Sequence, residues 1–234
     1  MGHRRARLAG ALLLGGALLA GCAPRTPAAS SLLARVDAAM AHSSSYRLTG
    51  GDRAGQTASR FQALVNHRGD FAASLVTSVP GSPSLRSRVV AVAGHVYVLA
   101  PIQLQELGIA SLPGDLSPAT TWVEQPPAVA RSYHRSLSPF FGPGLARTLR
   151  QALRGQATVR PGRRRGRSLW VVTERSRQAS LRLWIDASTG RLLQLRVRGP
   201  QPVSLVYSHF GGAGEVNPPP SANVYVPPTP APGG

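Results

Sequence analysis

The side chains that most often carry out chemistry are scattered along this 234-residue chain. The six histidines show no paired spacing such as HExxH, and one cysteine alone, Cys22, cannot form a thiolate zinc cluster. The nine acidic residues are dispersed, and Asp52, Asp70 and Asp186 lie in expected turns, where Asp bonds the backbone. No G-x-S-x-G elbow, Walker motif or dinucleotide-binding motif occurs. We therefore expect no catalytic residue, no metal site and no cofactor, and we predict that the protein is not an enzyme.

Cys22 has a chemical context of its own. Three arginines within residues 4–7 precede an uncharged apolar run at 8–20, shorter than the roughly 20 residues that span a bilayer. This order is typical of a secretory signal peptide. The run ends in Leu-Ala-Gly-Cys at 19–22, which resembles the bacterial lipobox, whose thiol accepts a diacylglycerol. We predict that residues 1–21 are cleaved and that Cys22 becomes the lipidated N-terminus; the alternative is an ordinary secretory signal with an incidental cysteine.

The predicted anchor places the protein on the extracytoplasmic face of a cell membrane or outer membrane. All 27 basic residues are arginine, and losing the three before Cys22 leaves 24 against nine acids, a net charge of +15. That charge predicts attraction to anionic lipid headgroups, anionic glycans or nucleic acid, of which export makes nucleic acid the least expected partner. The run containing Arg163, Arg164, Arg165 and Arg167 has two interpretations: contact with anionic lipid, or a solvated hairpin loop.

Periodicity divides the rest of the chain into elements. Apolar residues at helical spacing predict a helix over about 32–40 and a second helical region within 138–153. Gly50-Gly51-Asp52 with Gly55, and Pro161-Gly162, predict turns. Strand-like runs lie between such signals, at about 46–50, 59–66, 70–79, 87–92, 95–99, 122–123, 157–160, 169–174, 180–186, 191–198 and 202–210.

The elements form one domain. We predict a tether at 22–29, the domain at 30–216 and an extended or disordered Pro-rich tail at 217–234. Several strands alternate with one polar face, which is typical of an antiparallel sheet that covers a core on one side only. The predicted fold class is α+β, with one large curved sheet covered by about two helices.

Four landmarks occur in a fixed order over about residues 30–226. The first helix leads into Tyr46, the segment 94–98 is followed by Thr121-Trp122-Val123, and then come the runs 183–193 and 205–211. This arrangement resembles the LolA/LolB/LppX-like superfamily of envelope lipid-carrying proteins, which includes actinobacterial lipoproteins of the LppX and LprG kind. The resemblance implies an open, strongly curved half-barrel of antiparallel strands, with helices on its concave side.

The resemblance also implies a function. In lipid-carrying members the space between sheet and helices takes acyl chains, so we expect a non-enzymatic lipoprotein that binds or carries a lipid or lipoglycan. Candidate ligand contacts are Phe140, Phe141, Leu145, Leu149 and Trp122, with the alternative that the phenylalanines belong to the core. A second function stays open, that of an envelope sensor or scaffold with the same fold and no bound lipid.

Replacing the predicted acceptor thiol tests the anchor directly. We expect Cys22→Ser to abolish incorporation of radiolabelled fatty acid and to release the processed protein from the membrane fraction, because serine cannot form the thioether to diacylglycerol. A processed Cys22→Ser variant that still sediments with membranes would contradict lipid anchoring.

Overall fold

The computed structural model describes residues 26–99, 116–117, 119–137, 142–153, 157–200 and 202–227. Within these ranges it contains the helices α1 (Ala29–Ala41), α3 (Pro127–Leu137) and α4 (Gly142–Ala152). The first six strands are β1 (Ser45–Ala54), β2 (Thr57–Asn66), β3 (Phe71–Ser78), β4 (Leu85–Val92), β5 (His95–Leu99) and β6 (Trp122–Glu124). The others are β7 (Thr158–Arg164), β8 (Arg167–Arg175), β9 (Ser180–Asp186), β10 (Leu192–Arg198), β11 (Val203–Ser208) and β12 (Val224–Tyr225).

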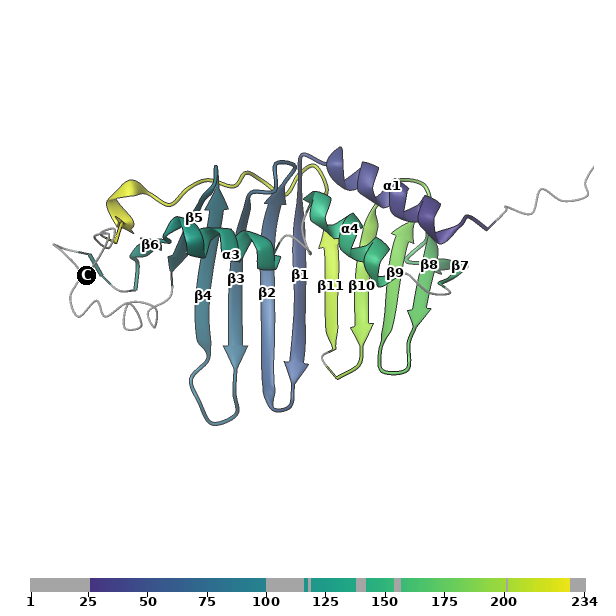
Figure 1. The fold of residues 1–234 in the computed structure, drawn as a ribbon, viewed down its shortest axis with the longest axis horizontal. Coiled ribbons are helices and arrows are strands. Elements are labelled where there is room, and N and C mark those ends of the chain that lie inside the picture. Colours follow the sequence, from purple (N-terminus) through teal and green to yellow (C-terminus); the bar gives the residue numbers. More distant parts are fainter. Residues whose placement is uncertain are drawn as a thin grey trace, which may run out of the picture.

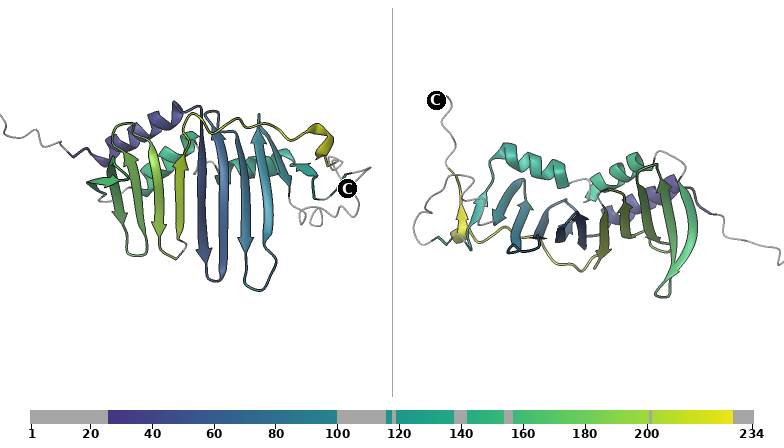
Figure 2. Two further views of the ribbon diagram at one scale, coloured as in Figure 1. Left: turned by 180° about the vertical axis from the view of Figure 1, so that it is seen from behind. Right: turned by 90° about the horizontal axis from the view of Figure 1, so that it is seen from below.

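The strands form one sheet in the order β12-β6-β5-β4-β3-β2-β1-β11-β10-β9-β8-β7. Two antiparallel meanders, β1 to β6 and β7 to β11, are joined where β1 pairs with β11. The last pair, β12 with β6, is parallel. The sheet curves, and the three helices lie on its concave side (Figures 1 and 2). The predicted α+β class with a curved, open antiparallel sheet is therefore confirmed.

Alternation along each strand separates an apolar face from a polar one. In β9 and β10 the directly paired Leu183 and Leu195 are buried on the concave side, whereas the next pair, Arg182 and Arg196, is exposed on the outer side. The core lies between the concave face and the helices, so it has one layer of sheet beneath it. Buried side chains of α1 complete it, and each stabilises the fold by about 1.5–3 kcal/mol; these are Leu32, Leu33, Val36 and Met40.

The turn between β9 and β10 positions α1. Asp186 accepts hydrogen bonds at Oδ1 from the Ser188 hydroxyl and the Thr189 backbone N–H, which fixes the turn. Arg35 of α1 donates from Nη2 to the carbonyl oxygen of Ala187 at 2.8 Å. Gly190 has a φ of +73°, and a Cβ there would lie 3.1 Å from Cβ and O of Arg35. The helix therefore rests on a turn that requires glycine.

The structure corrects several sequence-based boundaries. β1 continues through Gly50-Gly51 to Ala54, and the turn is at Gly55, because both glycines keep extended geometry within paired strands. β7 likewise runs through Pro161-Gly162, since proline is tolerated at a sheet edge, where its missing N–H costs no ladder bond. The predicted helical region at 138–153 contains α4, whereas α3 was not predicted, although Pro127 suits a first helical position.

The C-terminal segment that connects β11 to β12 crosses the outer side of the sheet (Figure 2, left). Val216 is 8% exposed within it, and the Ala213 N–H donates to the Ser45 hydroxyl oxygen at 3.2 Å. Part of the segment assigned to the tail, up to residue 227, thus includes a 3-10 turn (Ser221–Asn223) and the strand β12.

The α1–turn contact can be measured with two glycine substitutions. Gly190→Ala should lower the free energy of unfolding by about 2 kcal/mol or more, because a left-handed φ and the contact with Arg35 both oppose a methyl group. Gly55→Ala is the matched control, since Gly55 has a φ of +60° with open space around it, and should lose about 1 kcal/mol. Equal losses in urea unfolding would show that α1 does not press on Gly190.

Candidate functional site

One half of the concave face is filled by the protein's own side chains. α1 and α4 lie in front of β8 to β11 (Figure 1), and α4 contributes Leu145 and Leu149 to the same buried core as Leu183 and Leu205. Arg150 of α4 also forms an ion pair with Asp37 of α1 at 2.9 Å. The structure therefore places the predicted ligand contacts Leu145 and Leu149 in the packed core of this half.

The other half of the concave face is partly bare. β1 to β4 extend beyond the helices toward their hairpin turns (Figure 1). Leu75 and Leu85 there are 41% and 48% exposed, and their neighbours Phe61 and Val89 are partly buried. Phe61 pairs directly with Leu75, and the other two lie diagonally across from Leu75 on the same face. We call these four residues the apolar strip; the sequence pattern did not identify it because all four look like ordinary core positions.

A glycine gives the strip its contact with the core. Phe61 pairs with Gly50, and a Cβ on Gly50 would lie 3.1 Å from Cε1 of Phe61 and 2.6 Å from Cδ2 of Leu205. The absent side chain lets Phe61 and Leu205 approach each other over β1. The strip is therefore continuous with the packed core, and an apolar group placed on it would extend that core.

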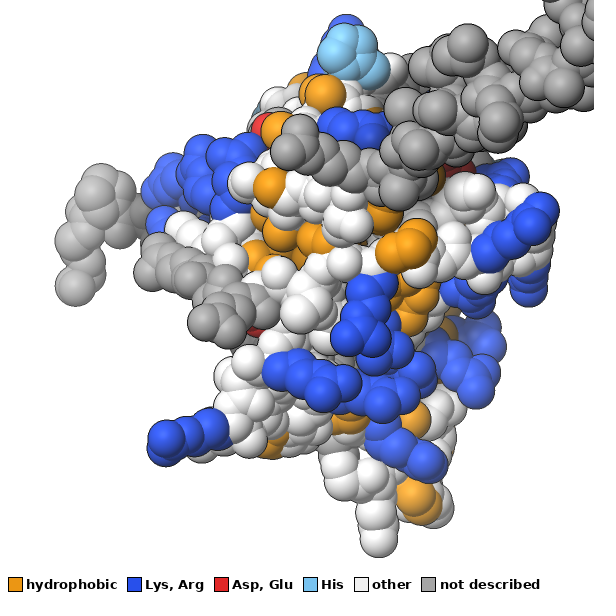
Figure 3. Space-filling view, turned by 90° about the vertical axis from the view of Figure 1, so that its right-hand side faces the viewer, with side chains coloured by type: hydrophobic (Ala, Val, Ile, Leu, Met, Phe, Trp, Pro, Cys, Tyr) orange, Lys and Arg blue, Asp and Glu red, His pale blue; other side chains and the backbone are white. Residues whose placement is uncertain are grey.

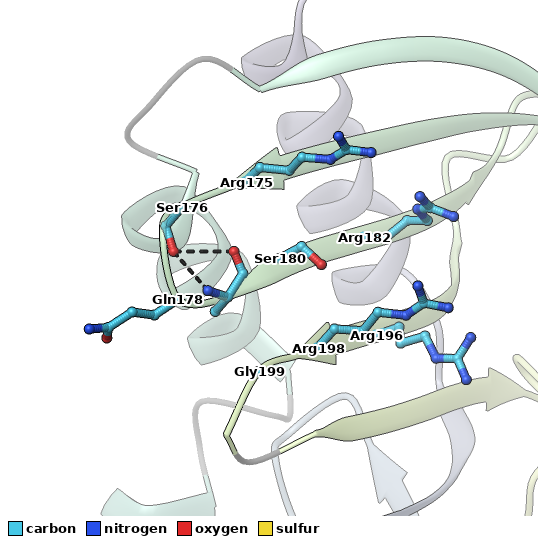
Figure 4. Close-up of a pocket in the computed structure, with 9 residues that line it drawn as sticks. Arg175, Ser176, Gln178, Ser180, Arg182, Arg196, Arg198 and Gly199 are labelled. Carbon is cyan, nitrogen blue, oxygen red and sulfur yellow. Dashed lines mark hydrogen bonds between the residues drawn. The ribbon is translucent and has the colours of Figure 1, made fainter.

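The outer face carries the opposite chemistry. Arg175, Arg182, Arg196 and Arg198 extend from β8, β9 and β10 around a pocket of about 460 Å³ near the β8–β9 turn (Figure 4). We call these four residues with Ser180 the arginine pocket. Arg182 lies over the ring of Trp184, 5.7 Å from its centroid. Seen from the β7 side, several groups of arginine side chains lie on the visible surface among hydrophobic and other side chains, with little acidic surface between them (Figure 3).

The predicted basic run forms the hairpin between β7 and β8. Its turn is Arg165-Gly166, and all four arginines of the run are exposed, as either interpretation requires. Arg164 donates to Oε1 of Gln194, two residues from the pocket's Arg196. The hairpin and the arginine pocket thus belong to the same half of the molecule.

The remaining candidate residues do not meet at one site. Trp122 is partly buried, and it lies on the outer side because its neighbour Val123 faces the core opposite Val98. Cys22, Phe140 and Phe141 lie outside the described residues. The structure therefore does not bring Trp122 together with Leu145 and Leu149.

Few described groups have unusual titration chemistry. Burial, with a contribution from Tyr46, raises the pKa of Tyr207 well above its ordinary value. Burial opposes ionisation of Asp186, yet the hydrogen bonds from Ser188 and Thr189 outweigh it and lower its pKa. Among the described residues, no three His, Cys, Asp or Glu side chains gather as a metal site would require. Nor is any helix of the described part long and apolar enough to span a membrane.

Comparison with solved structures finds similar folds. LprF from Mycobacterium bovis is 12% identical with a TM-score of 0.48, over 83% of this chain and 99% of LprF. MucB in complex with MucA(peri) is 16% identical with a TM-score of 0.36, over 81% of this chain and 58% of that chain. No protein-family model matches the sequence, and the comparison with curated proteins gave no match. Similarity at this level identifies no ligand and no partner.

Replacing Tyr207 tests whether a buried hydroxyl in the filled half lacks a hydrogen-bond partner. It is buried and has no hydrogen-bond partner in the described structure. Tyr207→Phe should therefore raise the free energy of unfolding by about 1 kcal/mol, because the folded protein no longer has to desolvate an unpaired hydroxyl. A loss of stability on urea unfolding would mean that the hydroxyl has a partner in solution.

Proposed function

We propose that this protein is a membrane-anchored extracytoplasmic lipoprotein that binds a hydrophobic ligand, a lipid or lipoglycan, without catalysing a reaction. The observation that supports the proposal most directly is the apolar strip, where Leu75 and Leu85 expose much of their surface on the face that elsewhere forms the core. An acyl chain laid on the strip would gain about 0.8 kcal/mol for each methylene that it buries.

The position of α1 supports a location close to the bilayer. α1 begins over the β7–β8 end of the sheet (Figure 1). The seven peptide links from the lipidated Cys22 to Ala29 span at most about 25 Å. The β7–β8 hairpin would therefore lie near the headgroups, where a basic residue contributes about 1 kcal/mol of attraction to anionic lipid. Membrane contact by Arg163, Arg164, Arg165 and Arg167 is part of this proposal.

A sensor or scaffold function is the second candidate. The packing of α1 and α4 against β8 to β11 favours it, since a concave face filled by side chains leaves less room for a lipid. In that case the apolar strip would receive apolar side chains of a protein partner. The two functions differ in what occupies the apolar strip when the protein is extracted from the membrane: a lipid in the first, and no lipid in the second.

Native mass spectrometry of the protein extracted from membranes tests the lipid proposal. We expect a co-purifying lipid, and uptake of a fluorescent fatty acid by the delipidated protein. Leu75→Ser combined with Leu85→Ser should weaken fatty-acid binding about tenfold or more, because both substitutions remove apolar surface that the acyl chain would cover.

A matched control separates the strip from apolar surface in general. Val206, on the outer face of β11, and Val226, beyond β12, are 40% and 63% exposed. Val206→Ser combined with Val226→Ser should leave fatty-acid binding unchanged. If no lipid co-purifies and no fatty acid binds, the carrier proposal fails; if both double variants bind as the parent does, the strip is not the binding site.

A further inference from the structure

The arginine pocket contains an arrangement that works against folding. Arg182 of β9 and Arg196 of β10 are directly opposite each other on the outer face. Arg175 and Arg198 each pair with Ser180 from either side. Like charges directly opposite on a sheet are destabilising, and the diagonal neighbours are also within reach of long side chains. Four positive charges therefore share one small area of the sheet.

No carboxylate within the described structure neutralises this cluster. The described salt bridges join Arg150 to Asp37 and His95 to Glu124, and neither involves the pocket. Glu174 is adjacent to Arg175 in sequence but pairs with Leu181 on the opposite face. The repulsion among the four guanidinium groups is thus left for solvent or for a bound anion to relieve.

Parts of the pocket are held in place before any anion binds. Trp184 lies beneath Arg182, and stacking on an aromatic ring restricts a guanidinium. Ser176 and Ala179 exchange hydrogen bonds across the β8–β9 turn, which forms one wall (Figure 4). The volume of about 460 Å³ lies within the range of about 300–1,000 Å³ that is usual for ligand pockets.

From this geometry we propose that the arginine pocket binds a phosphate group. Arginine donates in a fork that matches phosphate oxygens, and a phosphate monoester carries a charge of about −1.5 to −2 near neutral pH, so one group offsets more of the cluster than one carboxylate would. The pocket faces away from the apolar strip, so its anion binding does not require the hydrophobic ligand. The phosphate belongs either to a lipid headgroup in a membrane or to a soluble phosphate ester.

The experiment uses the mature chain with Cys22→Ser, so that no acyl group contributes to binding. Glycerol phosphate is the soluble probe, followed by tryptophan fluorescence because Trp184 lies beside the pocket. Phosphatidylcholine vesicles with and without phosphatidic acid, whose headgroup is a phosphate monoester, are the membrane probe, followed by sedimentation. We expect binding to at least one phosphate probe, weakening as salt is raised, and weakened about tenfold or more by Arg182→Gln with Arg196→Gln.

Arg60→Gln with Arg86→Gln is the matched control. These residues lie further along the same register row of the outer face, so both double variants lose two positive charges from one surface. The control should change binding less than about twofold, because its arginines lie outside the pocket. Arg182→Gln with Arg196→Gln should unfold at the same or a higher temperature, since it removes a like-charge pair; should it not fold, Arg198→Gln takes its place.

The two sources of phosphate give different results. A soluble ester is the source if glycerol phosphate binds and displaces vesicles, whereas a headgroup is the source if only anionic vesicles bind and the pocket variant abolishes that binding. The proposal is overturned if neither probe binds. Equal weakening by the two double variants also overturns it, because net charge alone would then explain the attraction.

Discussion

The pairing of β1 with β11 is the contact on which the remaining architecture depends. Six register pairs, from Arg47–Ser208 to Asp52–Val203, join the two meanders into one sheet. Tyr46 packs against Tyr207 and Phe210 beside this junction, with ring centroids 6.1 and 5.9 Å apart. α1 ends only a few residues before β1, and the hydrogen bond from Arg35 to the carbonyl oxygen of Ala187 in the β9–β10 turn holds it over the β8 to β11 half of the sheet.

The consequence is a sheet whose two halves have different free surfaces. In the β8 to β11 half, α1 and α4 fill the concave side, and the outer side of β8 to β10 carries the arginine pocket. In the β1 to β4 half the strands extend beyond the helices, so the apolar strip remains partly exposed on the concave side (Figure 1). A sheet one residue thick can present both surfaces because neighbouring residues of each strand face opposite sides.

Local sequence patterns predicted most strands and the curved α+β fold, because period-2 alternation depends on each strand's own residues. They could not predict the β1–β11 or β6–β12 pairing, which joins segments far apart in sequence. Alternation along 180–186 and 191–198 puts Arg182 and Arg196 on the polar faces of their strands, but it cannot show that the two residues are directly opposite each other. That register depends on the bulge between Leu192 and Gln194, without which the β10 side chains would point to the other face. The apolar strip was missed because exposure of Leu75 and Leu85 depends on how far the helices reach.

The order of tether, α1 and β1 links the two proposals. α1 directly follows the proposed tether and, with α4, fills the concave side of the β8 to β11 half, so that half leaves no free apolar face for a lipid among the described residues. The described surfaces that remain in this half are the basic hairpin and the outer face with the arginine pocket, where we propose contact with anions that salt would weaken. In the proposed function, hydrophobic binding is therefore left to β2 to β4, beyond the β1–β11 junction. Under both proposals, the chain order separates an electrostatic surface nearer the tether from an apolar surface farther along the sheet.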